Sequence, residues 1–120
     1  MGEREFDAIV VGAGAPGEVC AGRLADGGLE VAIVEPHLVG GECSYYACMP
    51  SKALLRPAEA LAEVRRVPGA AEAVTGELDP VAALRRRDEV ISNLEDSGQL
   101  PWLEHRGIEL FRGRGELDGE

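Results

Sequence analysis

The sequence predicts an α/β fold in which a parallel sheet is built on a βαβ unit. Three observations predict it: short apolar runs at Phe6–Val11 and Glu30–Glu35, a glycine-rich turn after the first run, and a helical pattern between them. Short β-branched runs bounded by turn residues are typical of buried parallel strands. Such a strand–helix–strand unit forms a right-handed crossover.

The first helix is expected to follow the glycine-rich turn and to end at Gly27–Gly28. Val19, Cys20, Leu24 and Ala25 are spaced to cover one helical face. Cys20 is therefore expected to be a small core residue.

Two further helices are predicted downstream. One begins near Pro50, and Pro57 inside its pattern is expected to kink or split it. Its expected apolar face consists of Leu54, Leu55, Ala58, Leu61 and Val64. The other has Asp79 as its N-cap and Gly98 past its end. The segment IELFRGRGELDGE then predicts a last strand with a turn.

The charge balance argues against several partners. Lys and Arg number 12 against 22 Asp and Glu, and a net charge of -10 would repel nucleic acid and anionic membranes. The basic run at 85–87 is flanked by acids and is expected to be a solvated helix face without a function. Because the sequence shows no signal-peptide pattern and no membrane-spanning apolar run, a cytoplasmic protein is expected.

A G-x-G-x-x-G fingerprint follows the first predicted strand. Gly12 permits the tight turn, Gly14 lets the backbone approach a pyrophosphate, and Gly17 allows the helix to pack close to the strand. Glu35, 18 residues after Gly17, can accept hydrogen bonds from both ribose hydroxyls. The pattern predicts an ADP-containing dinucleotide but does not separate FAD from NAD. A glycine-rich turn beside a surface glutamate is the alternative.

Cys43 and Cys48 are separated by four residues ahead of a predicted helix. In a straight helix their Cα atoms would be about 8.6 Å apart, whereas a disulfide needs roughly 4.4–6.8 Å. A disulfide here requires a distorted first turn and should be reducible, which favours redox chemistry over a structural role. Zinc is a poor alternative, because adding His37 still leaves one ligand missing.

The sequence resembles the flavin-dependent pyridine nucleotide-disulfide oxidoreductases. The resemblance rests on VVGAGAPG, VAIVEPHLVGGECSYYACMPSKALL and GIELFRGRGELDG, and it covers essentially the whole chain. It implies a Rossmann-like, three-layer FAD-binding domain. It also implies that electrons pass from NAD(P)H through FAD to a Cys43–Cys48 disulfide and on to a small-molecule or protein disulfide.

The same resemblance implies the roles of single residues. Cys43 is the interchange thiol that attacks the substrate, and Cys48 is the charge-transfer thiolate against the flavin. Lys52 lies near the reactive edge of the isoalloxazine. The other implied FAD contacts are Gly41, Glu42 and the backbone around Gly115.

Two departures from the family pattern affect the site. Glu42 stands where Thr is usual, so its carboxylate must turn to solvent or a cation to avoid the flavin pyrophosphate. Tyr45 and Tyr46 lie between the cysteines and are expected either to pack against neighbouring structure or to shape a distinctive substrate site.

The length predicts an incomplete enzyme. Residues 1–120 are expected to be the N-terminal part of an FAD-binding domain, without the NAD(P) and dimerisation domains of the family. The parent is then expected to be a homodimer, in which a partner subunit's His-Glu pair transfers protons. The alternative is a stand-alone dinucleotide-binding or thiol redox-sensing module without reductase turnover.

Overall fold

The computed structural model describes residues 2–119, and the chain divides into two compact units. The sheet unit contains the residues up to Cys43 and those from Glu95 onward. The hairpin unit is Ser44–Leu94.

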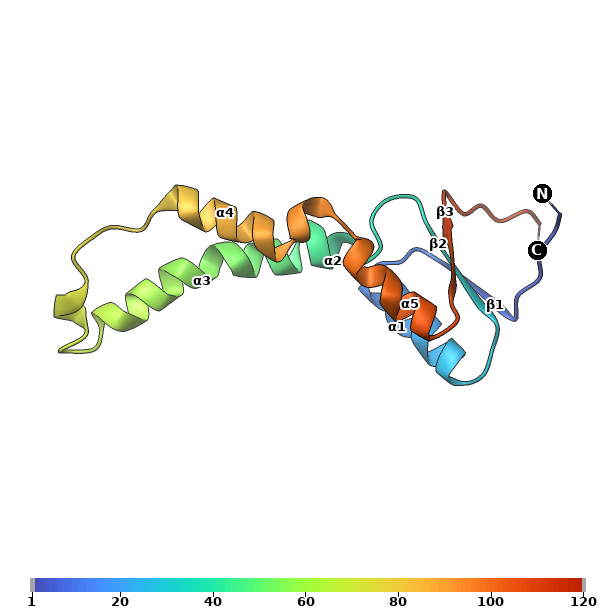
Figure 1. Ribbon diagram of the computed structural model, residues 1–120, viewed down its shortest axis with the longest axis horizontal. Coiled ribbons are helices and arrows are strands. Elements are labelled where there is room, and N and C mark those ends of the chain that lie inside the picture. The colour runs from blue at the N-terminus through green and yellow to red at the C-terminus, as the bar shows by residue number, and fades with distance from the viewer. Residues whose placement is uncertain (1, 120) are drawn as a thin grey trace. The chain divides into compact units, whose positions relative to one another are not determined.

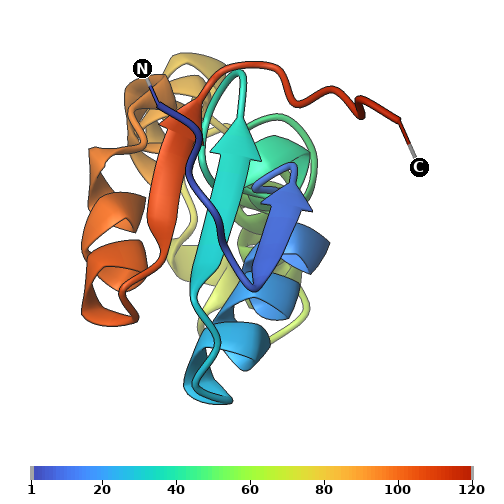
Figure 2. The ribbon, with the colours of Figure 1, turned by 90° about the vertical axis from the view of Figure 1, so that its right-hand side faces the viewer.

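The sheet unit contains three parallel strands. They are β1 (Ala8–Val11), β2 (Val31–Glu35) and β3 (Glu109–Arg112), in the order β1-β2-β3 (Figure 2). Val10 of β1 pairs with Ile33 of β2, which pairs in turn with Leu110 of β3. The predicted α/β class and the parallel sheet are therefore confirmed.

Helices α1 (Ala15–Asp26) and α5 (Leu100–His105) cover one face of this sheet (Figures 1 and 2). A 3₁₀ turn at Ser97–Gln99 precedes α5. The core between helices and sheet consists of Ala13, Ala21, Val31, Ile33, Val39, Leu103 and Ile108. On β1, Ile9 and Val11 point to the other face and are 58% and 60% exposed.

The inner face of α1 differs from the expected one. Ala21 and Gly22 are the buried residues, whereas Cys20 is exposed and Val19 is 55% exposed. The reason is the indole of Trp102, because a Cβ built on Gly22 would approach its Cζ2 to 3.0 Å. The expectation that Cys20 is a core residue is wrong.

The hairpin unit pairs α3 (Cys48–Arg65) with α4 (Pro80–Val90) (Figure 1). The connection between them contains a 3₁₀ turn at Ala71–Ala73. Helix α3 is not split, since it runs through Pro57 as one element. No helix within residues 2–119 has both the length and the apolar character needed to cross a membrane.

Helix α4 begins as predicted and ends early. The Asp79 side chain accepts hydrogen bonds from the backbone N–H groups of Val81 and Ala82, at 2.9 and 3.1 Å. The 3₁₀ turn Ser92–Leu94 then has φ values of 51°, 50° and 61°, which no right-handed helix can contain. The helix therefore stops well before Gly98.

Two other expectations for the hairpin unit are corrected. Helix α3 buries Pro50 and Ala53, while three residues of the expected apolar face, Leu54, Leu55 and Val64, are 39%, 55% and 37% exposed. The basic run is only partly a solvated face: Arg86 donates to a backbone carbonyl of α3, and Arg87 pairs with Asp88 at 2.7 Å.

Candidate cofactor and redox site

The glycine turn connects β1 to α1. The Gly12 N–H donates to the Val34 carbonyl at 2.8 Å, and Gly12 has φ +100°. A Cβ on Gly17 would lie 1.9 Å from the Gly12 carbonyl oxygen, so only glycine fits there. Gly14 is the N-cap of α1, and no side chain among residues 2–119 caps this end. The helix start is therefore open to an anion, which helix N–H groups and the helix dipole favour.

Glu35 lies at the carboxyl end of β2, beside this turn. Its Oε2 accepts from the Ala13 N–H and its Oε1 from the His37 N–H, both at 2.8 Å, and Glu35 is 8% exposed. Each carboxylate oxygen has a second lone pair. Glu35 thus braces the glycine turn and can still accept hydroxyl donors.

The cysteine-bearing segment packs directly on the glycine turn. Helix α2 (Gly41–Tyr45) begins at Gly41, whose φ is +64° and where a Cβ would lie 2.6 Å from the Gly14 Cα. The Gly40 N–H donates to the Ala13 carbonyl at 2.8 Å. Cys43 is therefore on a helix whose first residue contacts the turn.

Cys43 and Cys48 form a disulfide. Helix α2 ends at Tyr45 and α3 begins at Cys48, with Ala47 between them at φ -127° and ψ -86°. The bond thus closes across a break in the helix, as the spacing required. Cys48 is the first residue of α3, where the helix dipole favours a thiolate.

The other predicted site residues lie in both units. Lys52 is exposed, one turn after Cys48, and lines a groove of about 410 Å³ in the hairpin unit. In the sheet unit a Cβ on Gly115 would lie 2.9 Å from Val11 Cγ1, so this segment passes over the end of β1. Glu42 is exposed, which meets the condition for a carboxylate at this position.

An ion pair that the sequence reasoning missed holds the loop between β2 and α2. Asp96 is 7% exposed, accepts from Arg112 at 2.6 and 3.0 Å, and accepts from the Val39 N–H at 2.7 Å. Arg112 also donates to the His37 carbonyl at 2.8 Å. The hydrogen bond from Arg112 lowers the pKa of Asp96. Asp96 belongs to no motif, and the only available signal for it was an Asp next to a Ser-Gly turn. Arg112 lies within the segment GIELFRGRGELDG, but nothing in that segment points to Asp96 as its partner.

Glu18, in the first turn of α1, was also missed. Its Oε1 is buried and accepts no hydrogen bond from any residue in the range 2–119. Burial raises the pKa of this carboxyl group. A glutamate directly after the last glycine of the fingerprint was the available signal, because an acid there opposes anion binding.

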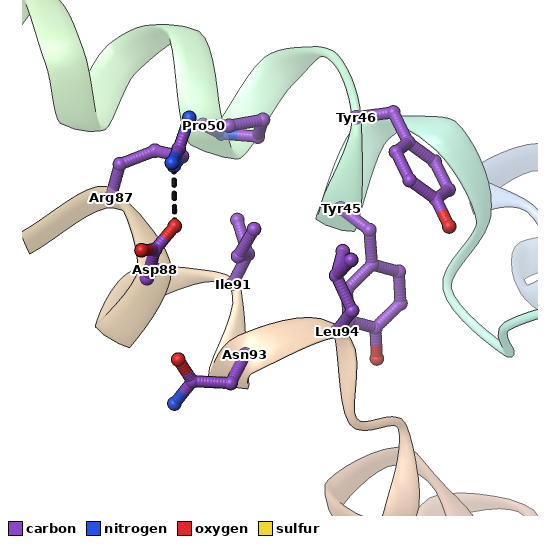
Figure 3. Close-up of a pocket in the computed structure, with 8 residues that line it drawn as sticks. All are labelled: Tyr45, Tyr46, Pro50, Arg87, Asp88, Ile91, Asn93 and Leu94. Carbon is purple, nitrogen blue, oxygen red and sulfur yellow. Dashed lines mark hydrogen bonds and ion pairs between the residues drawn. The ribbon is translucent and has the colours of Figure 1, made fainter. Parts of the chain in front are cut away.

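A pocket of about 470 Å³ lies within the hairpin unit (Figure 3). Tyr45 and Tyr46 line one side, and the Arg87–Asp88 pair lines another. Its remaining lining residues are Pro50, Ile91, Asn93 and Leu94. Tyr45 is buried, as expected for a packing residue, whereas Tyr46 is 61% exposed and available to a ligand.

These residues fit an ADP-containing dinucleotide. An uncapped helix start, a turn in which glycines permit close backbone approach, and a carboxylate with spare acceptor capacity meet at one end of the sheet. The Cys43–Cys48 disulfide follows on the adjoining segment.

The chain is similar to known proteins over nearly all of its length. Residues 6–119 match the family described as pyridine nucleotide-disulphide oxidoreductase. The dihydrolipoyl dehydrogenase of Chlamydia muridarum is 37% identical over 93% of this chain, and that of Zymomonas mobilis is 38% identical over 95%. The copper(II) complex of the HOCl-induced flavoprotein disulfide reductase RclA from Escherichia coli superposes on 96% of the chain with a TM-score of 0.73 and 25% identity.

The chain spans about a quarter of the length of these proteins, with 24% of each dehydrogenase and 23% of the RclA chain covered. The match nevertheless extends over nearly all of the residues present and includes both the glycine turn and the cysteine pair. The chain belongs to the pyridine nucleotide-disulphide oxidoreductase family.

Proposed function

We propose that this chain is the FAD-binding and disulfide-bearing part of a flavoprotein disulfide reductase. Electrons would pass from NAD(P)H through FAD to the Cys43–Cys48 disulfide and then to a small-molecule or protein disulfide. The observation that carries the proposal is the contact of Gly41 with Gly14, because it joins the cysteine segment to the glycine turn.

Four groups of atoms would hold the cofactor. The pyrophosphate would lie against the backbone of Gly12 and Gly14 and the open start of α1. Glu35 would accept the ribose hydroxyls, and Lys52 would lie near the flavin. The remaining FAD contacts would be Gly41, Glu42 and Gly115. When bound, FAD supplies the electron pair that reduces the disulfide.

The reduced cysteine pair would then reduce the substrate in two thiol–disulfide exchange steps. The Cys43 thiolate attacks a substrate disulfide, forms a mixed disulfide and releases one substrate thiol. The Cys48 thiolate attacks Cys43, which releases the second thiol and restores the Cys43–Cys48 bond. In the longer, homodimeric and cytoplasmic parent that we propose, the groups that transfer protons lie outside these residues.

The exposed Tyr46 marks where the substrate would approach. The pocket that it lines combines aromatic and apolar side chains with the Arg87–Asp88 ion pair, in which both partners are partly exposed. Such a lining suits a disulfide with an apolar body and one polar group.

Calorimetric titration of the chain with FAD, FMN and NAD⁺ tests the cofactor assignment. FAD should bind, and FMN, which lacks the ADP half, should bind at least tenfold more weakly if the glycine turn and Glu35 hold that half. Gly41→Ala should abolish FAD binding, because its Cβ would meet the Gly14 backbone.

Gly76→Ala is the matched control, since a Cβ there has open space. Equal affinity for FAD and FMN would contradict the assignment. Cysteines that cycle with glutathione in a chain that binds no FAD would instead indicate a thiol redox module.

A further inference from the structure

Pro57 leaves one carbonyl of α3 without its helical partner. In an α-helix the carbonyl of residue 53 accepts the N–H of residue 57, and proline has none. Ala53 is 3% exposed, so water has little access to this residue. A shielded carbonyl without a donor is destabilising, and the partner must come from elsewhere.

Arg86 of α4 supplies that donor. Its Nη1 donates to the Ala53 carbonyl at 2.9 Å, across the contact between the two helices. This hydrogen bond is charge-assisted and is therefore stronger than the backbone N–H···O=C hydrogen bond that Pro57 removes. Arg86 and the neighbouring Arg85 are both exposed, and of the two side chains only that of Arg86 has a hydrogen bond to another of residues 2–119.

The hydrogen bond from Arg86 is made to the first turns of α3, which contain Cys48 and Lys52. Ala53 follows Lys52 directly and lies five residues after Cys48, the first residue of the helix. Pro57 removes one of the hydrogen bonds that tie these turns to the rest of α3, and the bond from Arg86 takes its place. Arg86 and Lys52 line the same groove.

We propose that Arg86 is a positioning residue for the Cys48–Lys52 segment: it replaces the hydrogen bond that Pro57 withholds and keeps Cys48 in place to form its disulfide with Cys43. The redox role of the pair rests on the proposed function, whereas the link between Arg86 and Pro57 does not. No flavin is needed to test this link, so its failure is distinguishable from failure of the FAD assignment.

The test is a double-mutant cycle in a Cys20→Ser background, which removes the third thiol. Arg86→Met keeps an apolar stem and loses the donors, and Pro57→Ala restores the missing N–H. Arg85→Met is the matched control. Each variant is unfolded with urea and is also equilibrated with glutathione, where the chain disulfide and two glutathione molecules exchange for a chain dithiol and one glutathione disulfide.

Arg86→Met should raise the unfolding equilibrium constant about tenfold and lower the disulfide-to-dithiol ratio severalfold at a fixed glutathione buffer. Arg85→Met should change neither. In the Pro57→Ala background, Arg86→Met should lose most of both effects, because the helix then satisfies its own carbonyl. Arg86→Lys, which keeps a charged donor, should recover part of them.

Three results would overturn the proposal. One is an equal effect of Arg86→Met with and without Pro57, and another is an equal effect of Arg85→Met. The third is a loss of stability with an unchanged disulfide-to-dithiol ratio, since that would make Arg86 structural only. If Arg86→Met alone does not fold, the comparison of Pro57→Ala with Pro57→Ala/Arg86→Met decides, because persistent unfolding there contradicts the rescue.

Discussion

Arg112 holds Asp96 at two points, with Nη1 2.6 Å from Oδ2 and Nη2 3.0 Å from Oδ1. The same carboxylate accepts the Val39 N–H, and the same guanidinium donates to the His37 carbonyl. The end of β3 is thereby tied to the loop that leads into the cysteine-bearing helix. Because Asp96 is nearly buried, removing its charge should weaken this tie strongly.

Asp96→Asn should destabilise the chain by about 2 kcal/mol at pH 7. The folded-state pKa of Asp96 is lowered, chiefly by the hydrogen bond from Arg112, so the stabilisation is present above the ordinary aspartate pKa and is lost as the pH falls through the folded value. Urea unfolding is measured from pH 7 down to pH 2. The free energies of unfolding of wild type and variant should therefore become equal in acid.

Arg114→Gln is the control for this prediction. Arg114 and Glu116 are 3.9 Å apart and 85% and 80% exposed, so the change should be nearly neutral. If the difference in free energy of unfolding between wild type and Asp96→Asn stayed constant down to the lowest pH, the negative charge of Asp96 would not be what stabilises the fold.

Gly17→Ala should destabilise the sheet unit by about 3 kcal/mol or more. The new Cβ would lie 1.9 Å from the Gly12 carbonyl oxygen, and relieving this clash requires the backbone itself to move. Gly98→Ala, with open space around its Cβ, should change stability little. Thermal unfolding followed by circular dichroism compares the two. Equal melting points would show that the turn is not close-packed.

Glu18→Gln should stabilise the chain at pH 7. The folded-state pKa of Glu18 is raised by desolvation, so the protonated carboxyl is favoured and stability is lost as the pH rises through the folded value. The glutamine amide does not ionise, so the variant should not lose stability as the pH rises. The urea midpoint of the variant should therefore be higher than that of wild type at pH 7, and the two midpoints should become equal near pH 3.

Glu89→Gln, at an exposed position of α4, should show no such pH-dependent gain. A Glu18→Gln variant that is less stable than wild type at pH 7 would mean that the helix dipole outweighs the desolvation of this carboxylate.

The sequence predicted the parts of the fold that local chemistry determines. The strands at Ala8–Val11 and Val31–Glu35 and the N-cap at Asp79 depend on neighbouring residues alone, and the structure has all three. The close approach of Gly12 and Gly17 also follows from the glycine spacing. The site could be predicted to that extent, while the ligand contacts of these residues remain predictions.

Contacts between distant residues could not be predicted in the same way. The burial of Gly22 instead of Cys20 depends on Trp102, which is far along the chain. The end of α4 depends on left-handed residues at Ser92–Leu94, a run that contains no glycine to signal it. The hydrogen bond from Arg86 is visible only once α3 and α4 are paired.

The absorption spectrum of the FAD-loaded chain after two-electron reduction tests the central claim most directly, namely that Cys48 faces the flavin while Cys43 faces the substrate. We expect a long-wavelength charge-transfer band that Cys43→Ser retains, because the Cys48 thiolate remains, and that Cys48→Ser abolishes. A chain that binds FAD and shows no such band, or a band that survives Cys48→Ser, would contradict this claim.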